Sequence, residues 1–270
     1  MRIEPFRIED IELFLKLSAD EKWLAEAWEF RFLLSVFAEG CFTARDEIGN
    51  AIGFVTSIRH DRSGWIGNLI VQEKYRGNGI GEELFLRAMH SLYTAGAETI
   101  WLTASKMGIA LYEKHGFKNM DTIIRWTGQG QGESKELLPK HDAIFGRNSD
   151  RAGWGDQRKT LMDAVVNRGS VWSVGTASLV VQPCANAVQI GPFSATVMSD
   201  AGEVLAEALG GIPKNSKVYV DTPAANQVAF SLFTEAGFMH HGINKLMSVG
   251  SNPEYRPEYI YGLATLGSCG

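Results

Sequence analysis

The residues with the clearest chemical signature form a glycine-rich run between an expected strand and an expected helix. They are Arg76, Gly77, Asn78, Gly79, Ile80 and Gly81. Glycines let the backbone approach a ligand closely. The first turn of the following helix would offer unpaired N–H groups at the positive end of its dipole. Such a cradle suits a pyrophosphate, and the run therefore predicts a nucleotide ligand that carries a diphosphate. A tight turn that binds nothing is the alternative interpretation.

Two better-known phosphate loops do not fit this run. A P-loop requires Gly-Lys-Ser or Gly-Lys-Thr, and no such triplet follows here. The dinucleotide fingerprint has a different order of glycines and a second strand–helix unit with an acid for the ribose. The run must therefore be interpreted together with the elements that position it.

The expected elements of the first half alternate between helix and strand. Residues Ile80, Leu84, Ala88 and Leu92 recur every four positions, which predicts a helix directly after the glycine run. Further helices are expected at 11–17, 23–37 and 106–114, and strands at 40–45, 51–58, 65–71 and 99–103. A final strand pair is expected from 116 to about 127.

A polar, glycine-dense stretch from Thr127 to Ser134 predicts a linker. We expect a first domain at 1–127, a linker at 128–143 and a second domain at 144–270. The second half repeats the first in outline. For example, Leu111-Tyr-Glu-Lys-His-Gly-Phe117 corresponds to Leu232-Phe-Thr-Glu-Ala-Gly-Phe238.

Composition and charge exclude several classes of protein. The chain has 270 residues, of which 45% are hydrophobic and 21% charged, as in ordinary globular proteins. A disordered or fibrous chain is therefore excluded. The formal net charge is −5 and no basic run is present, so neither a nucleic acid nor a membrane is an expected partner.

The cysteines and histidines indicate no disulfide framework and no metal. Cys41, Cys184 and Cys269 lie far apart and are odd in number, which favours a reducing, cytoplasmic setting. Residues 169–199 carry no charge, but Pro183, Pro192 and many polar residues argue against a membrane span. No histidine has metal-ligand spacing with a cysteine or an acid.

Three segments together resemble the GNAT superfamily of acyl-CoA-dependent N-acetyltransferases. They are Leu69-Ile70-Val71, Arg76 to Gly81, and Leu111-Tyr112-Glu-Lys-His-Gly-Phe117. The resemblance covers the first half in the expected element order. The second half looks like a degenerate repeat, so the chain is similar to tandem-GNAT proteins. The implied fold class is α+β, with a mixed, twisted sheet flanked by helices in each half.

The resemblance implies acetyl-CoA as cofactor and a role for each matched residue. Leu69, Ile70 and Val71 would pair with the pantetheine arm like an added strand. Residues 76–81 would hold the pyrophosphate, mainly through backbone N–H groups. Tyr112 would stand near the sulfur and protonate the departing thiolate as a general acid. A ring that merely packs on the sheet is the alternative for Tyr112.

Two departures from the family pattern bear on the mechanism. Ser105 stands where the family often has Asn, seven residues before the Tyr. The strand before the loop carries no carboxylate, so the sequence names no general base. The second half lacks the glycine run and has Phe233 opposite Tyr112, and we expect that it has lost acetyl-CoA binding and contributes to the acceptor pocket.

The acceptor is the least determined part of the prediction. We expect a small-molecule amine; a protein N-terminus or lysine is the alternative acceptor. Trp65, Trp28 and Asp221 are candidate substrate contacts, although core packing of Trp28 and helix capping by Asp221 are the plainer interpretations. A non-catalytic acyl-CoA-binding or sensing module is the rival function. A monomer is favoured because a tandem repeat can replace a dimer interface.

Overall fold

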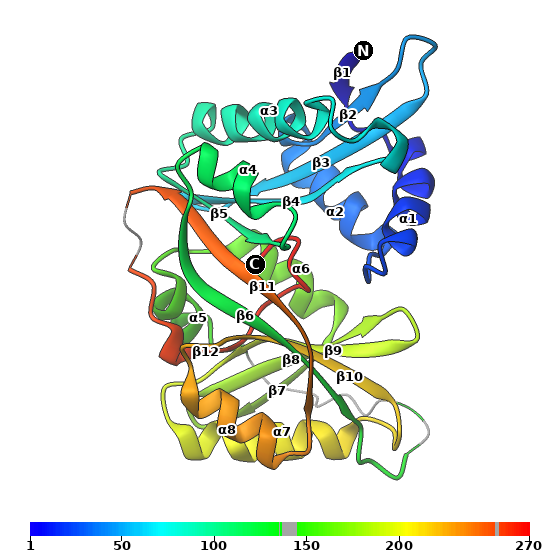
Figure 1. Ribbon diagram of the computed structural model, residues 1–270. Helices are drawn as coiled ribbons and strands as arrows, with labels where there is room; N and C mark the ends of the chain where they lie inside the picture. The colour runs from blue at the N-terminus through cyan, green and yellow to red at the C-terminus, as the bar shows by residue number, and fades with distance from the viewer. Residues whose placement is uncertain (135, 137–144, 252–253) are drawn as a thin grey trace.

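The computed structural model describes residues 1–134, 136, 145–251 and 254–270, and their strands join into one sheet (Figure 1). Within these residues the 12-stranded sheet has the order β1-β2-β3-β4-β5-β11-β6-β10-β9-β8-β7, and β12 pairs with β9. The strands are β1 (Arg2–Pro5), β2 (Phe42–Arg45), β3 (Ala51–Arg59), β4 (Ser63–Val71), β5 (Thr99–Ala104), β6 (Lys118–Gln129), β7 (Ser170–Val174), β8 (Ala177–Cys184), β9 (Ala187–Ser194), β10 (Lys217–Pro223), β11 (Met239–Gly250) and β12 (Ile260–Gly262).

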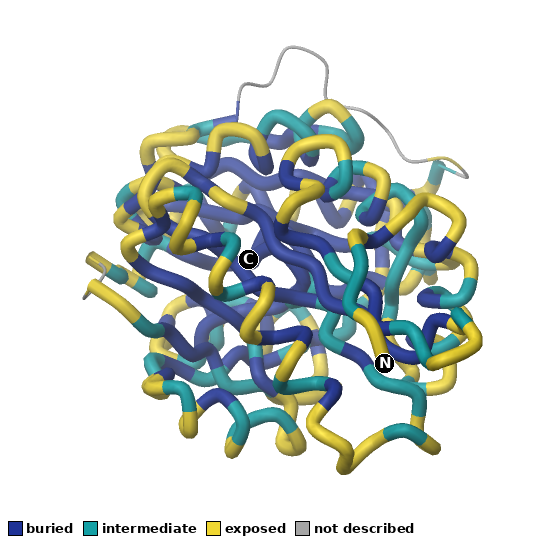
Figure 2. The backbone as a smooth tube through the Cα atoms, turned by 90° about the horizontal axis from the view of Figure 1, so that it is seen from above, coloured by how far each residue is buried: buried dark blue, intermediate teal, exposed yellow. Residues whose placement is uncertain are grey.

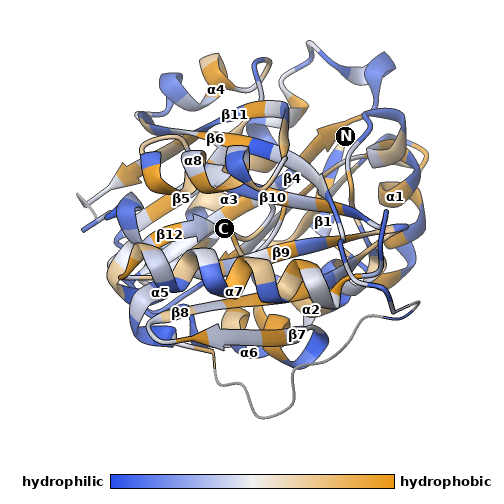
Figure 3. Ribbon diagram, turned by 90° about the horizontal axis from the view of Figure 1, so that it is seen from below, coloured by the Kyte–Doolittle hydropathy of each residue, from blue (hydrophilic) through white to orange (hydrophobic). Residues whose placement is uncertain are grey.

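Helices flank the sheet in both halves of the chain. They are α1 (Ile11–Asp20), α2 (Ala27–Phe37), α3 (Ile80–Thr94), α4 (Ile109–Lys114), α5 (Arg147–Trp154), α6 (Lys159–Arg168), α7 (Met198–Gly211) and α8 (Gln227–Glu235). In α7 the buried residues Ala201, Val204, Leu205, Ala208 and Leu209 form one apolar face. Figure 3 shows hydrophobic and hydrophilic residues on this helix, and Figure 2 shows that the buried backbone follows the central strands. Among the described residues, no helix combines the length and apolarity needed to cross a membrane.

The prediction of a strand pair after Gly116 is wrong, because residues 118–129 form the single strand β6. Its neighbours come from the second half. β11 pairs with β5 through Lys245–Gly250 and with β6 along most of its length, while β6 pairs with β10 through Ile123–Gln129. Each half thus contributes its last long strand to the centre of the common sheet, where the two strands lie side by side (Figure 1).

The domain boundary expected after residue 127 falls inside the strand β6. Gly128 and Gln129, which were assigned to the linker, belong to β6, and most of the remaining linker lies outside the described residues. The two halves remain recognisable as repeats. Gly116 and Gly237 both adopt positive φ, +85° and +78°, between a short helix and a long strand.

The helix expected at 23–37 begins only at Ala27. Glu26 precedes it in an extended conformation, with φ −132° and ψ 146°. Its carboxylate pairs with Arg168 and accepts a hydrogen bond from the Ala185 backbone N–H at 2.9 Å. Contacts with the second half therefore hold Glu26 in an extended conformation before the helix. The helix expected from 106 likewise begins at Ile109.

Candidate active site

β4 and β5 run in parallel at first and then separate. Their pairing joins Ser63–Trp65 to Thr99–Trp101 and stops there, although β4 continues to Val71. Against its other neighbour, β4 has a bulge. Gly67 pairs with Thr56 and Ile70 with Phe54, so that Asn68 and Leu69 together oppose one residue. Asn68 adopts a left-handed φ of 55° as a result. The gap lies beside Leu69, Ile70 and Val71, as the resemblance implies for the pantetheine arm.

The glycine run forms an open turn at the start of α3. Gly77 and Gly79 have φ of +78° and +77°, a conformation that favours glycine, and no atom lies within 4 Å of a Cβ added at either residue. Gly79 is the N-cap of α3. The first-turn N–H groups of this helix lack intrahelical partners and point toward the open turn. These features fit a pyrophosphate, the group that the resemblance predicts here.

The side chain of Arg76 fastens this turn rather than reaching out of it. Its Nε donates to the Val71 carbonyl at 2.9 Å, and its Nη2 pairs with Glu21. An acid in the first turn of α3, Glu82, would repel an anion. It pairs with Lys114 at 2.6 Å and with His115 at 2.7 Å, and these partners lower its pKa.

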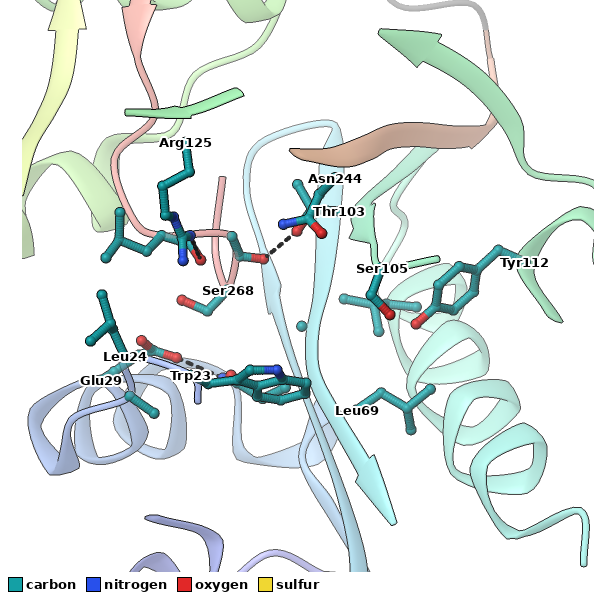
Figure 4. A pocket seen from close by; sticks show the side chains of 16 residues that line it. Trp23, Leu24, Glu29, Leu69, Thr103, Ser105, Tyr112, Arg125, Asn244 and Ser268 are labelled. Atoms are coloured by element: carbon teal, nitrogen blue, oxygen red, sulfur yellow. Dashed lines mark hydrogen bonds between the residues drawn. The ribbon is translucent and has the colours of Figure 1, made fainter. Parts of the chain in front are cut away.

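A cavity opens where β4 and β5 separate (Figure 4). Its walls come from both halves of the chain. It is lined by Trp23, Leu24 and Ala25 before α2; Glu29 of α2; Ile66, Gly67, Asn68 and Leu69 of β4; Thr103, Ser105 and Tyr112; Arg125 of β6; Asn244 of β11; and Leu266, Gly267 and Ser268. Of the residues that the sequence matched to the cofactor, Leu69 and Tyr112 line this cavity, whereas Ile70, Val71 and residues 76–81 do not.

Tyr112 lies on α4 and directs its hydroxyl into the cavity beside Ser105 (Figure 4). Its ring packs against Phe85 and Phe117, with centroids 5.2 and 6.1 Å away. The side chain is only 8% exposed. Burial raises the pKa of Tyr112 to about 12, so the phenol is protonated at neutral pH and can donate.

Glu29 lies on α2, and its carboxylate faces the same cavity (Figure 4). Asn68, in the bulge of β4, donates to its Oε1 at 2.6 Å and to Thr56 at 3.0 Å. Burial raises the pKa of Glu29, and hydrogen bonds from Asn68 and Ser268 oppose the shift. A carboxylate with a raised pKa in a cavity is a suitable proton acceptor near neutral pH.

The sequence did not reveal Glu29 as a candidate base. The signal was present but local and weak: Glu29 is the only acid in α2, a helix otherwise rich in Trp, Phe and Leu. Arg125, Asn244 and the residues from Leu266 to Ser268 were also missed, because only the pairing of β6 with β11 and the path of the chain after β12 bring them to the cavity.

The three candidate substrate contacts do not line this cavity. Trp65 is 1% exposed, and its ring packs edge-on against that of Trp154, with the centroids 5.8 Å apart. It is a core residue and does not reach the acceptor cavity. Trp28 stacks on Phe32 at 5.6 Å and lines a small adjoining cavity instead.

The carboxylate of Asp221 is already neutralised and is not available to a cationic substrate. Both of its oxygens accept from Arg125, Oδ1 from Nε at 2.7 Å and Oδ2 from Nη2 at 2.6 Å. Asp221 is 1% exposed, and burial of an ion pair requires this kind of two-point geometry. Asp221 thus positions Arg125, which does line the cavity.

In the second half, the chain itself fills the corresponding gap. β9 and β10 pair in parallel only at Val188–Gln189 and Val218–Tyr219, and β12 then pairs with β9 beyond that point. Thr222 donates to the Tyr261 carbonyl at 2.7 Å, and the Leu263 N–H donates to the Asp221 carbonyl at 2.8 Å. A strand of this chain therefore occupies the place where a pantetheine arm would pair.

Asn226 helps to hold this inserted strand. It stands at the position where the family often has Asn and the first half has Ser105. Its side chain caps α8 by accepting from the Ala229 N–H at 2.9 Å, and it donates to the Ile260 carbonyl at 3.0 Å. Phe233 has no hydroxyl that could serve as a proton donor. Together with the inserted strand, this explains why the sequence of the second half departs from the family pattern.

The fold and the cavity define an acyltransferase of the acetyl-CoA-dependent type, and comparison with known families agrees. A model of the acetyltransferase (GNAT) family matches residues 6–117, and a model of an acetyltransferase (GNAT) domain matches residues 147–262. The chain therefore belongs to the GNAT family of acetyltransferases, as a tandem of two such domains. Acetyl-CoA is the acetyl donor of this family.

Individual relatives cover one or both halves. N-alpha-acetyltransferase MAK3 of Arabidopsis thaliana is 29% identical over 120 residues, which are 41% of this chain and 63% of that protein. The chain thus spans less than two thirds of that relative. N-alpha-acetyltransferase 30 of Dictyostelium discoideum is 27% identical over 48% of this chain and 75% of that protein. A crystal structure from Pyrococcus horikoshii shares the fold, with a TM-score of 0.84, 22% identity, and coverage of 100% of this chain and 95% of the other.

Proposed function

We propose that this chain transfers an acetyl group directly from acetyl-CoA to a small-molecule amine. The observation that carries the proposal is one cavity with a proton acceptor, Glu29, on one wall and a proton donor, Tyr112, on the other (Figure 4). The bulged part of β4 lies between them. When bound, acetyl-CoA supplies a thioester carbonyl that a neutral amine can attack.

Glu29 removes the proton that the amine must lose. As the new N–C bond forms, the nitrogen gains positive charge and its proton becomes acidic. The Glu29 carboxylate takes that proton, directly or through a water. Asn68 orients the carboxylate from the bulge. A backbone N–H group of the bulge would serve as the donor to the thioester oxygen.

Tyr112 supplies the proton that the departing sulfur gains, and solvent returns it afterwards. A phenol with a pKa of about 12 would be a poor acid toward a thiol in water, whose pKa is about 8.5. The phenol therefore acts by donating a hydrogen bond to the sulfur, and its proton is transferred as negative charge develops there while the C–S bond breaks.

The enclosure of the cavity favours a small acceptor. The loop at Trp23–Ala25 covers one side, β11 another, and residues Leu266–Ser268 a third. A peptide would need an open groove across these segments. The names of the relatives, both N-alpha-acetyltransferases, favour a protein N-terminus as the alternative acceptor.

The test measures CoA release with purified full-length chain, acetyl-CoA and two sets of acceptors. One set contains primary amines from propylamine to octylamine and common diamines; the other contains short peptides with free N-termini. Turnover with amines at least about tenfold faster than with any peptide supports the proposal. Faster turnover with peptides identifies the alternative acceptor. Binding of acetyl-CoA without any turnover identifies the acyl-CoA-sensing alternative.

We also propose a cytoplasmic monomer. Cys41, Cys184 and Cys269 are all buried free thiols, which suits a reducing compartment. The two repeats already share one sheet through β6 and β11, so a second copy is not needed to complete the cavity. Light scattering of the purified chain tests the oligomeric state.

A further inference from the structure

The segment Leu263–Ser268, which we call the C-terminal segment, joins the second half to the acceptor cavity. Side chains of β8 in the second half and of β6 in the first half hold its beginning. Gln182 donates to the Ala264 carbonyl at 2.9 Å, and Arg125, fixed by Asp221, donates to the Leu266 carbonyl at 2.9 Å. Because β12 immediately precedes it, the strand that fills the second gap also anchors this segment.

The first half holds the other end of the segment at the point where β4 and β5 separate. The Gly267 carbonyl accepts from Thr103 Oγ1 at 2.9 Å and from Trp65 Nε1 at 3.3 Å. The approach to β4 is very close: a Cβ added at Gly67 would lie 2.2 Å from the Ser268 carbonyl oxygen. The segment is therefore fixed on both sides, and its position is part of the fold.

Leu266 belongs to the wall between two cavities, which it forms with Leu24 and Glu29. It lines the acceptor cavity described above, together with Leu24 and Glu29. The same three residues also line the adjoining cavity, whose other walls include Trp28 and Arg168. An acceptor that extends past Leu266 would therefore enter this adjoining space, where Trp28 supplies an apolar surface beside polar side chains such as Arg168 and Gln182.

We propose that the C-terminal segment limits the length of the acceptor and that Leu266 is the residue that sets this limit. The second half then acts in the reaction by holding this segment, in place of binding a cofactor. The inference rests on the proposed amine acceptor and names the part of the chain that selects it. Truncation of Leu266 should join the two cavities and admit longer amines.

The experiment measures binding, so that it does not depend on turnover. CoA is linked through an acetyl bridge to propylamine or to hexylamine, and the affinity of each conjugate is measured by calorimetry. Wild type should bind the propyl conjugate better than the hexyl conjugate. Leu266→Ala should change this ratio by at least about tenfold in favour of the hexyl conjugate, the discrimination expected when a hydrophobic pocket accepts additional methylenes.

Leu34→Ala is the matched control, because Leu34 is also half-buried, belongs to α2 and lines neither cavity. It should leave the ratio as in wild type. If Leu266→Ala does not fold, Leu266→Val should show a smaller change in the same direction. An unchanged ratio in a folded Leu266 variant overturns the inference, whether or not wild type acetylates amines. Lack of acetyl transfer by wild type, with an altered ratio, instead overturns the proposed function alone.

Discussion

Replacement of Gly67 by alanine tests the geometry of the acceptor wall most directly. The added Cβ would lie 2.2 Å from the Ser268 carbonyl oxygen and 2.9 Å from its carbonyl carbon and Cα. Real contacts require about 3.2 Å, so the C-terminal segment must move by about 1 Å. That shift would break the bonds from Thr103 and Trp65 to the Gly267 carbonyl, now 2.9 and 3.3 Å long.

Two hydrogen bonds at about 0.5–1.5 kcal/mol each predict a loss of about 1–3 kcal/mol in the free energy of unfolding. Urea denaturation measures this loss. The displaced segment should also raise the KM for the amine, while calorimetry should find the affinity for CoA unchanged, since residues 69–81 do not move.

Gly210→Ala provides the control, since Gly210 lies in α7 and no atom is within 4 Å of its added Cβ. Alanine there should stabilise the helix by up to about 1 kcal/mol. If Gly67→Ala is as stable as wild type and keeps the same KM for the amine, the close approach of Ser268 to β4 is incorrect and the argument from it fails.

Three further predictions concern the proton carriers and a buried histidine. Tyr112→Phe should lower kcat by about 10²–10⁴-fold with unchanged affinity for CoA, measured by stopped assay and calorimetry. Glu29→Gln should lower kcat by a similar factor. Because burial raises the pKa of Glu29, ionisation opposes folding, and the free energy of unfolding falls as pH rises through that pKa; Glu29→Gln should remove this fall and stabilise the chain at pH 7. His60 is 7% exposed, and burial lowers its pKa to about 3, so the unfolded state binds more protons between pH 3 and about 6.5. Stability should therefore fall by about 3 kcal/mol from pH 7 to pH 4, and His60→Phe should abolish this part of the fall.

Each of these predictions has a result that contradicts it. Wild-type kcat in Tyr112→Phe would assign the phenol to packing alone, with Leu111→Ala on the same helix as control. Equal stability of Glu29→Gln and wild type at pH 7 would show that the carboxylate is not penalised by burial. If the free energy of unfolding falls by the same amount from pH 7 to pH 4 in His60→Phe and in wild type, a group other than His60 takes up the proton.

The structural features that the sequence predicted correctly depend on residues that lie close together in the chain. The glycine run from Arg76 to Gly81 lies before a helix with a four-residue apolar period, and both signals lie within about 20 neighbouring residues. Positive φ at Gly77 and Gly79 agrees with that interpretation. Tyr112, at the start of the Leu111–Phe117 repeat segment, lies on the expected short helix and lines the cavity. Turns, caps and helix faces depend on residues close together in the chain, so a single sequence carries them.

Tertiary structure alone decided the rest of the active site. Which sheet a strand joins depends on pairing between distant segments, and the sequence pattern of β11 does not state that it pairs with β5 of the other half. The pairing brings Asn244 and Arg125 to the cavity wall. Trp65 and Gly267 are 202 positions apart, and only the folded chain makes Trp65 a support for the C-terminal segment rather than a substrate contact. Glu29 is a further case: its sequence neighbours suggest an amphipathic helix, and only burial in the folded chain raises the pKa of its carboxylate.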